Sequence, residues 1–462
     1  MFERQTNITP AQEAAQHTEL EYLRKVNARP WAGRLLGYAR LSGPGWIQGA
    51  ITLGAGTATS AFYLGWKFGY QMLWVNILGM AMGVIMFAAI ARPSLYRDES
   101  LYRAMGKYVH PALALAWAIA AIVTSMFWCL NQYAAAAACF ADLVQLGGWV
   151  STEQGLLSAR WMVGAMILAV SIPLTWTYAG KPRTGIRLYE TILKSIVFFM
   201  ILCFALVAWK TGIRWGELFR GLIPGDFPGS SDDRTMVLGA LGCTVGINMT
   251  FLFPITLRAR GWTREHLGLA RFDLGSGMLL PFAIISSLVV ITTANVLQGS
   301  PQRPDGPAAV AKVMTPLFEG TWLPDATGRV LFDLGIAAMP LSTITILMLI
   351  SGLALCEIRG VPYRGLWFRL GSLLPTVGIF GVAYKAPFWL GPLISSFALI
   401  LLPIAYLGFL VLCNRRAFLG PDLPTGGTRW AWNTAMGCVL AIALVGASVK
   451  VADSVGTFFS GQ

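Results

Sequence analysis

The sequence predicts an all-α membrane protein with about eleven transmembrane helices, of which the first and the sixth are broken near their middles. Hydrophobic residues make up 55% of the 462 residues and charged residues only 12%, whereas charged residues make up about a quarter of an ordinary soluble domain. Charge-free runs recur at the length of about 20 residues that an α-helix needs to cross a bilayer. Two of these runs carry glycine-rich interruptions, which are tolerated at membrane depth only where the freed backbone groups face protein or a solvated cavity.

The predicted spans follow directly from the charge-free runs. Nine are long enough alone: Leu41–Trp66, Met72–Ala91, Pro111–Ala141, Trp161–Gly180, Thr235–Leu257, Leu274–Gln302, Leu334–Cys356, Ala386–Asn414 and Trp430–Val449. Two shorter runs, Ser195–Trp209 and Leu370–Tyr384, are extended by flanking residues that reach the interface.

The basic residues orient these spans. With the N-terminus in the cytoplasm, most lysines and arginines fall in the inner segments, so the positive-inside rule predicts an external C-terminus in a plasma (inner) membrane. We expect residues 1–40 to form a cytoplasmic N-terminal segment without a cleavable signal peptide, 41–452 a single transmembrane domain, and 453–462 a short tail. The net charge of +13 fits inner loops beside anionic lipid, and no nucleic-acid partner is inferred.

The two interruptions predict the functional site. The first span is interrupted by Gly54-Ala55-Gly56-Thr57, and the sixth, within Leu238–Pro254, contains Gly239, Gly242 and Gly246. Small residues at such spacing also suit close helix packing. However, breaks in the first and sixth spans are five spans apart, which is the spacing expected of an inverted repeat of five helices whose half-helix ends meet at a substrate site.

At these residues the chain resembles the Nramp (natural resistance-associated macrophage protein) family of divalent-metal transporters. The resemblance is strongest from Gly43-Pro44 to Phe68-Gly69-Tyr70, and it continues at Thr244-Val245, at Leu188-Tyr189-Glu190 and at Leu341-Ser342-Thr343-Ile344-Thr345. It implies the LeuT-type fold of two inverted five-helix repeats and transport of a metal cation by alternating access.

The chain departs from that family at the positions where the family binds metal and conducts protons. The family's metal-binding Asp and Asn correspond to Gly54 and Thr57, and its sulfur ligand and histidine correspond to Gly246 and Asn248. In the third span, Ala121, Trp128 and Asn131 stand at the acidic positions of the family's proton path. We therefore expect transport that is not driven by proton symport.

The expected substrate site is neutral. Its residues are Leu53, Gly54, Ala55, Gly56, Thr57, Cys243, Thr244, Gly246 and Asn248, with the family's ligand positions at Gly54, Thr57 and Gly246. Divalent cations are generally bound with carboxylates that offset their charge, although magnesium keeps several of its waters. The resemblance thus favours a metal cation that stays largely hydrated, in an enlarged space.

Two other functions remain open. Glycine-rich half-helix ends also suit a carboxylate or other anion, so a small organic or anionic solute is one alternative, and a non-transporting sensor or scaffold is another. The sequence contains no nucleophile–base or phosphate-cradling motif, so neither an enzyme nor a cofactor is expected.

The remaining polar residues of the spans carry simpler expectations. Asp142 and Asp333, at the outer ends of the third and eighth spans, could guide cations. However, acids at span ends are usually solvated at the interface, and this is the expectation for both. Glu190 and Lys194 are four residues apart and are expected to pair locally.

Overall fold

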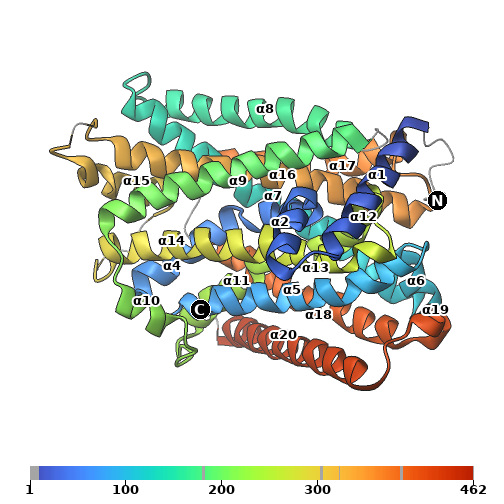
Figure 1. The fold of residues 1–462 in the computed structure, drawn as a ribbon. Coiled ribbons are helices and arrows are strands. Elements are labelled where there is room, and N and C mark those ends of the chain that lie inside the picture. Colours follow the sequence, from blue (N-terminus) through green and yellow to red (C-terminus); the bar gives the residue numbers. More distant parts are fainter. Residues whose placement is uncertain (1–9, 179–182, 302–304, 322, 385–388, 461–462) are drawn as a thin grey trace.

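The computed structural model describes residues 10–178, 183–301, 305–321, 323–384 and 389–460, and this part of the chain is helical without strands. The long helices run side by side as one bundle (Figure 1). The N-terminus, α6 and α19 lie at one end of the bundle, which we call the N-terminal end, and α10, α15 and the end of α20 lie toward the other, which we call the α15 end. The described residues therefore place the two termini toward opposite ends, as an odd number of spans requires.

The first repeat and the segment before it comprise the first nine helices. Their bounds are α1 Pro10–Asn27, α2 Trp31–Leu41, α3 Pro44–Thr52, α4 Ala55–Phe68, α5 Leu73–Tyr96, α6 Leu101–Tyr108, α7 Pro111–Leu146, α8 Glu153–Tyr178 and α9 Arg183–Thr211. The rest of the chain forms α10 Trp215–Gly221, α11 Ser231–Thr244, α12 Ile247–Ala259, η1 Arg264–His266, α13 Leu267–Leu274, η2 Gly275–Leu279, α14 Leu280–Leu297, α15 Pro307–Val313, η3 Thr315–Phe318, α16 Thr327–Arg359, α17 Leu366–Leu373, η4 Leu374–Ala383, α18 Leu390–Asn414, α19 Arg416–Leu419, η5 Gly420–Asp422 and α20 Gly426–Ser460.

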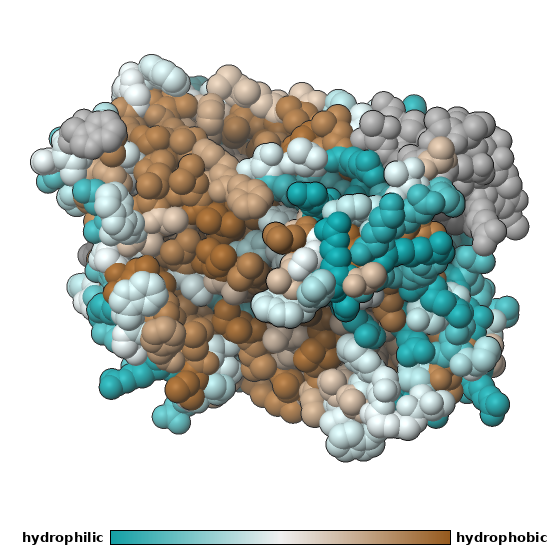
Figure 2. All heavy atoms as spheres, in the orientation of Figure 1, coloured by the Kyte–Doolittle hydropathy of each residue, from teal (hydrophilic) through white to brown (hydrophobic). Residues whose placement is uncertain are grey.

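Ten described helices are long and apolar enough to cross a membrane. One of them, Ser231–Ala259, is the pair α11 and α12 with the break between them. The half-helices α3 and α4 supply the remaining predicted segment, and the chain is an integral membrane protein. In Figure 2, hydrophobic side chains cover much of the face of the bundle, and hydrophilic side chains gather near the N-terminal end.

Both predicted breaks are present. Between α3 and α4, Leu53 (φ −85°, ψ 57°) and Gly54 (φ −105°, ψ 179°) leave the helical conformation. Between α11 and α12, Val245 (φ −142°, ψ 111°) and Gly246 (φ −85°, ψ 156°) do the same. The sequence prediction of broken first and sixth spans is confirmed.

Other glycines of the same segments serve helix packing. A methyl group on Gly49 would lie 2.1 Å from the carbonyl oxygen of Gly277 in η2, and one on Gly242 would lie 2.2 Å from the carbonyl oxygen of Ser395 in α18. A side chain at either position therefore requires the backbones to separate. The two interpretations that the sequence left open apply to different glycines: Gly242 packs and Gly246 breaks the helix.

The N-terminal segment is folded onto the bundle rather than extended. Leu23 and Val26 of α1 are fully buried. Arg24 donates to the carboxylate of Glu265 in η1 at 2.6 Å and 2.8 Å. Arg187 of α9 donates to Glu19 at 2.7 Å. Thus α1 contacts two elements that follow it by more than a hundred residues.

Candidate functional site

One face of α7 runs along both breaks. Ser125, Trp128 and Gln132 are three to four residues apart, so they share one side of the helix, and all three are buried. A methyl group on Gly246 would lie 3.6 Å from the Trp128 ring. The break of the first repeat and the break of the second therefore face the same wall, and at their junction a methyl group on Gly56 would lie 3.7 Å from Cβ of Cys243.

Gln132 fills the first break. Its side-chain carbonyl accepts a hydrogen bond of 2.8 Å from the backbone N–H of Ala55, the first residue of α4. A methyl group on Gly54 would lie 2.5 Å from Nε2 of Gln132 and 3.1 Å from Oγ1 of Thr343. The space that a carboxylate at position 54 would use is occupied by an amide from α7, so the expectation of an enlarged space at this position is wrong.

Gln132 was missed by the sequence reasoning, which compared only the positions of the family motifs. A signal was present, because Asn131-Gln132 is a pair of amides inside an otherwise alanine-rich apolar span, and polar side chains at membrane depth are functional candidates by default.

The second break is closed by its own residues. The Asn248 carbonyl accepts from the backbone N–H of Met249 at 2.9 Å, and its amide donates to Ser125 Oγ at 3.4 Å. The backbone N–H of Gly246 donates to the thioether of Met249 at 3.4 Å. The buried N-terminal end of α12 is thus capped by the side chains of its own Asn248 and Met249.

Several side chains of the predicted site donate to backbone carbonyls rather than pointing into open space. Thr57 donates to the carbonyl of Thr52, Thr59 donates to that of Ala55 at 2.9 Å, and the Cys243 thiol lies beside Thr57. Thr244 points elsewhere: its hydroxyl would lie 2.7 Å from a methyl group on Gly79 of α5. Of the predicted residues, Gly56 and Thr57 lie against Cys243. Leu53, Gly54 and Ala55 form the break beside Gln132, and Gly246 and Asn248 lie against Trp128 and Ser125 on the same face of α7. The Thr244 side chain is turned toward α5 instead.

Helix α16 adds two hydroxyls near the end of α3. Ser342 Oγ and Thr343 Oγ1 lie 3.3 Å and 3.5 Å from the carbonyl oxygen of Ala50, and all three residues are buried. The site is therefore lined by neutral oxygens, amides and sulfur. Among the described residues there is no group of three or more His, Cys, Asp or Glu side chains placed to hold a metal ion.

A charged cluster holds the start of α3 in place. The Asp273 carboxylate of α13 accepts from the Ser42 hydroxyl, from the N–H of Gly43 at 3.1 Å and from the N–H of Gly45 at 2.6 Å. Lys194 donates to the Ser42 carbonyl at 2.6 Å. Burial of these groups makes the cluster a firm attachment of the first half-helix.

The expected local pair of Glu190 with Lys194 is wrong. Within the described residues, the ion-pair partner of Glu190 is Arg260, at 3.3 Å, and both side chains are about 95% buried. The reason is that the end of α12 brings a second cation to α9, while Lys194 reaches the loop before α3 instead.

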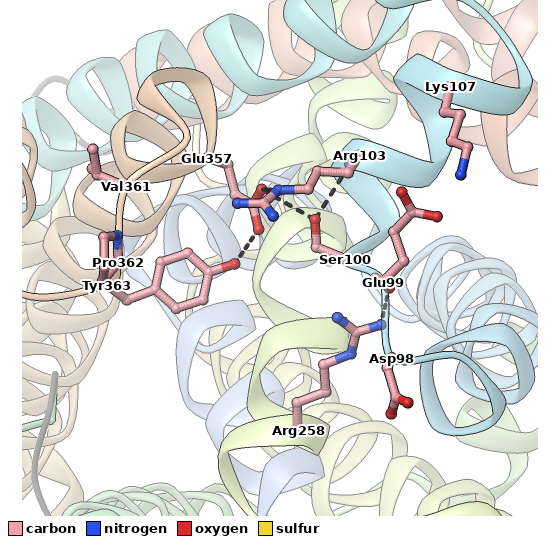
Figure 3. A pocket seen from close by; sticks show the side chains of 10 residues that line it. All are labelled: Asp98, Glu99, Ser100, Arg103, Lys107, Arg258, Glu357, Val361, Pro362 and Tyr363. Carbon is pink, nitrogen blue, oxygen red and sulfur yellow. Dashed lines mark hydrogen bonds and ion pairs between the residues drawn. The ribbon is translucent and has the colours of Figure 1, made fainter. Parts of the chain in front are cut away.

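A polar cavity of about 260 Å³ opens at the N-terminal end of the bundle, beside α6, α12 and α16 (Figure 3). Glu357 faces Ser100, at 3.0 Å, and the Tyr363 hydroxyl. Burial raises the pKa of Tyr363 well above its usual value, and the adjacent carboxylate of Glu357 adds to the effect. The remaining charged groups of the lining are Asp98, Glu99, Arg103, Lys107 and Arg258. The cavity mixes both signs of charge and lies away from the breaks.

Comparison with known proteins identifies the family. The family model described as "natural resistance-associated macrophage protein-like" matches residues 45–451. The chain belongs to the Nramp family. It is accordingly a member of a transporter family and not an enzyme.

The relatives of this Nramp chain are distant. It is 23% identical over 400 residues to the divalent metal cation transporter MntH of Mycobacterium tuberculosis, covering 84% of this chain and 87% of the relative. It is 25% identical over 260 residues to the MntH of Brucella suis, where the alignment spans 54% of the relative, about half of its length.

Solved structures confirm the LeuT-type fold. A mutant manganese transporter from Eremococcus coleocola superposes with a TM-score of 0.72 at 15% identity, covering 92% of this chain and 88% of that one. MhsT in complex with L-phenylalanine superposes with a TM-score of 0.55 at 14% identity, covering 87% of this chain and 98% of that one. At such identities the likeness concerns the fold alone.

Proposed function

We propose that this Nramp-family chain moves a divalent metal cation, largely hydrated and magnesium-like, by alternating access between the two breaks. We place its N-terminus in the cytoplasm and its C-terminus outside the plasma (inner) membrane, with 41–452 as the transport domain. The observation that carries the proposal is the meeting of both breaks on one face of α7, the first at Gln132 and the second at Trp128, with Gly56 beside Cys243. Curated relatives bear the name of divalent metal cation transporter, which favours a cation as the substrate.

The chemistry of the lining favours a hydrated ion. The groups nearest the breaks are the amide of Gln132, the hydroxyls of Thr57 and Thr343 and backbone carbonyls. A bare divalent ion loses hydration that neutral groups replace poorly, whereas an ion that keeps its waters needs only hydrogen-bond acceptors. Substrate binding then requires Gln132 to move, because its amide fills the space at Gly54 in this conformation.

An anionic or organic solute is supported less well. An anion site on the half-helix N-termini needs backbone N–H groups free to donate. The N–H of Ala55 donates to Gln132, and those of Gly246 and Met249 donate to side chains of α12. Three of the backbone donors at the two half-helix ends are therefore already occupied.

Contacts at the two ends supply the gates that alternating access needs. Toward the α15 end, Asp233 of α11 accepts from the Tyr63 hydroxyl of α4, and Lys67 lies 3.8 Å from the same carboxylate. At the N-terminal end, Asp273 holds the start of α3. Opening one side requires breaking one of these attachments while the other persists.

Uptake into proteoliposomes tests the proposal. We expect the protein to admit magnesium or manganese, reported by a dye trapped in the vesicles, and Gln132→Leu to reduce uptake at least tenfold. Gln154→Leu, on the exposed side of α8, is the matched control and should transport normally. Saturable uptake of a small carboxylate without any divalent-cation uptake would contradict the assignment and favour the anionic alternative.

A further inference from the structure

Asp333, in the second turn of α16, is a fully buried acid without a hydrogen-bond donor. Its side chain has no solvent exposure, and neither carboxylate oxygen has a hydrogen-bond partner in the described structure. It lies against the carboxylate of Asp142 and the thiol of Cys139, both on α7. The sequence expectation that Asp142 and Asp333 are solvated at the interface is therefore wrong, because α7 and α16 pack over them.

The neighbouring cationic side chains form ion pairs with Asp142. Arg329 of α16 donates to both of its oxygens, at 2.6 Å and 2.7 Å, and Lys312 of α15 lies 3.5 Å from one of them. Asp142 is 4% exposed. Helix α9, which also packs on this part of α16, presents Cys203 and the Phe204 ring at Gly335.

These contacts decide the protonation of the pair. Two adjacent buried carboxylates repel each other, and an unpaired buried charge costs several kcal/mol. As an anion, Asp333 lies against a second carboxylate, and the neighbouring Cys139 thiol is only a weak donor. As a neutral acid, its O–H donates to the Asp142 carboxylate, which satisfies both groups and leaves one negative charge opposite Arg329 and Lys312.

We propose that Asp142 and Asp333 form a proton-binding carboxyl pair at the α15 end of the bundle. One proton is shared between the two carboxyls while α15 is held against α7 through Lys312. Helix α15 also packs against α16 and against α4, the half-helix after the first break, so the same pair links a proton to a segment in contact with that half-helix. Loss of the proton adds a second negative charge opposite Arg329 and Lys312, which strengthens the electrostatic attachment of α15 through Lys312.

This proposal does not depend on the identity of the substrate. A bound proton at the pair is a property of the resting protein, and it is compatible with transport that moves no proton with the substrate.

Infrared difference spectroscopy on the reconstituted protein tests the shared proton. The wild type should show a carboxylic-acid carbonyl band of the pair that disappears between mildly acidic and alkaline pH. Asp333→Asn should remove that band and leave the bands of other buried acids, such as Glu190 and Asp273, in the difference spectrum. Asp226→Asn, which alters an exposed acid in a loop, is the matched control and should leave it unchanged. A band of the pair that persists in Asp333→Asn would overturn the proposal.

A second variant keeps the test decisive if Asp333→Asn does not fold. In Asp142→Asn, Arg329 is free to pair with Asp333 and the like charge is gone, so Asp333 should ionise and the band should be absent at mildly acidic pH even though Asp333 remains. Persistence of the band in Asp142→Asn would show that the two acids share no proton. Loss of the band on adding sodium at constant pH would identify a cation site instead.

Thiol labelling reads out the link to α15. Val310 of α15 is fully buried. In a background lacking the native cysteines, the labelling rate of Val310→Cys is divided by that of a cysteine at the exposed position of Asp226, because every thiol reacts faster as its thiolate forms. This ratio should be several-fold lower at alkaline than at mildly acidic pH, and Asp142→Asn should abolish that difference. A ratio independent of pH in the parent would refute the link.

Discussion

Replacing Gln132 by glutamate should create a tight divalent-cation site. The glutamate side chain has the same shape, so one oxygen keeps the bond from the Ala55 N–H that Gln132 accepts at 2.8 Å. The negative charge also faces the N-terminus of α4, where a helix favours anions. The substitution therefore adds a carboxylate at the centre of the two breaks without the steric conflict that an aspartate at position 54 would meet.

The magnitude follows from simple electrostatics. A carboxylate about 4 Å from a unit charge gains about 4 kcal/mol at an effective dielectric constant of about 20, and a doubly charged ion gains about twice as much. Desolvation of the buried carboxylate and of the ion consumes several kcal/mol. A remaining gain of about 2 kcal/mol corresponds to more than tenfold tighter binding.

Titration calorimetry with manganese and magnesium measures this change. We expect Gln132→Glu to lower Kd for both ions by more than tenfold relative to the wild type. Gln154→Glu adds the same charge on the exposed surface of α8 and should leave Kd unchanged. Equal affinities for the wild type and Gln132→Glu would refute the placement of the cation at the breaks.

Three further predictions follow from individual contacts. Asp273→Asn weakens the hydrogen bonds that the carboxylate accepts from Ser42, Gly43 and Gly45, so the free energy of unfolding in detergent should fall by about 1–3 kcal/mol. Thiol labelling of Ser42→Cys should accelerate in this variant. An unchanged melting curve and labelling rate would show that the cluster does not stabilise the start of α3. Gly49→Ala places a methyl group 2.1 Å from the Gly277 carbonyl and should cost about 1–3 kcal/mol or more, whereas Gly437→Ala, with open space around it, should change the unfolding free energy by less than about 0.5 kcal/mol. Tyr63→Phe removes the hydroxyl that donates to Asp233 and should speed labelling of a cysteine placed at Thr59 from the α15 end; slower labelling would contradict the role of this contact as a gate.

The fold could be predicted because it depends on features that the sequence shows directly. Apolar runs, their lengths and the glycine clusters at Gly54 and Gly246 are local properties, and the lack of backbone partners in lipid leaves few ways to use them. The residues at the breaks were predicted for the same reason. The direction of each side chain was not, since Thr244 and Cys243 are adjacent in the sequence and face different helices.

The sequence does not predict which distant side chain fills the space at a break or pairs with a buried charge. Gln132 is 78 residues from Gly54 along the chain, and Arg260 is 70 from Glu190, so their pairing depends on how α7 and α12 pack. The buried acids show the same limit. Asp142 and Asp333 lie near the ends of predicted spans, but helices α7 (Pro111–Leu146) and α16 (Thr327–Arg359) extend past those ends and bury both side chains.

The relation between Gly54 and Gln132 gives a physical reason why an aspartate, which the resemblance to the family would place at position 54, is not accommodated there. A side chain at position 54 and the amide of Gln132 compete for one space, since Nε2 lies 2.5 Å from the position of a Cβ at residue 54. The glycine and the glutamine are therefore a matched pair, in which a neutral amide from α7 occupies the space that a side chain at position 54 would need. Restoring an aspartate at position 54 should consequently require a second change, Gln132→Ala or Gln132→Gly, that vacates the space. We expect Gly54→Asp alone to destabilise the protein and the double variant to recover stability and to bind manganese, so coupling between the two positions in a double-mutant cycle tests the explanation directly. Additive effects on the unfolding free energy would show that the two residues do not share the space.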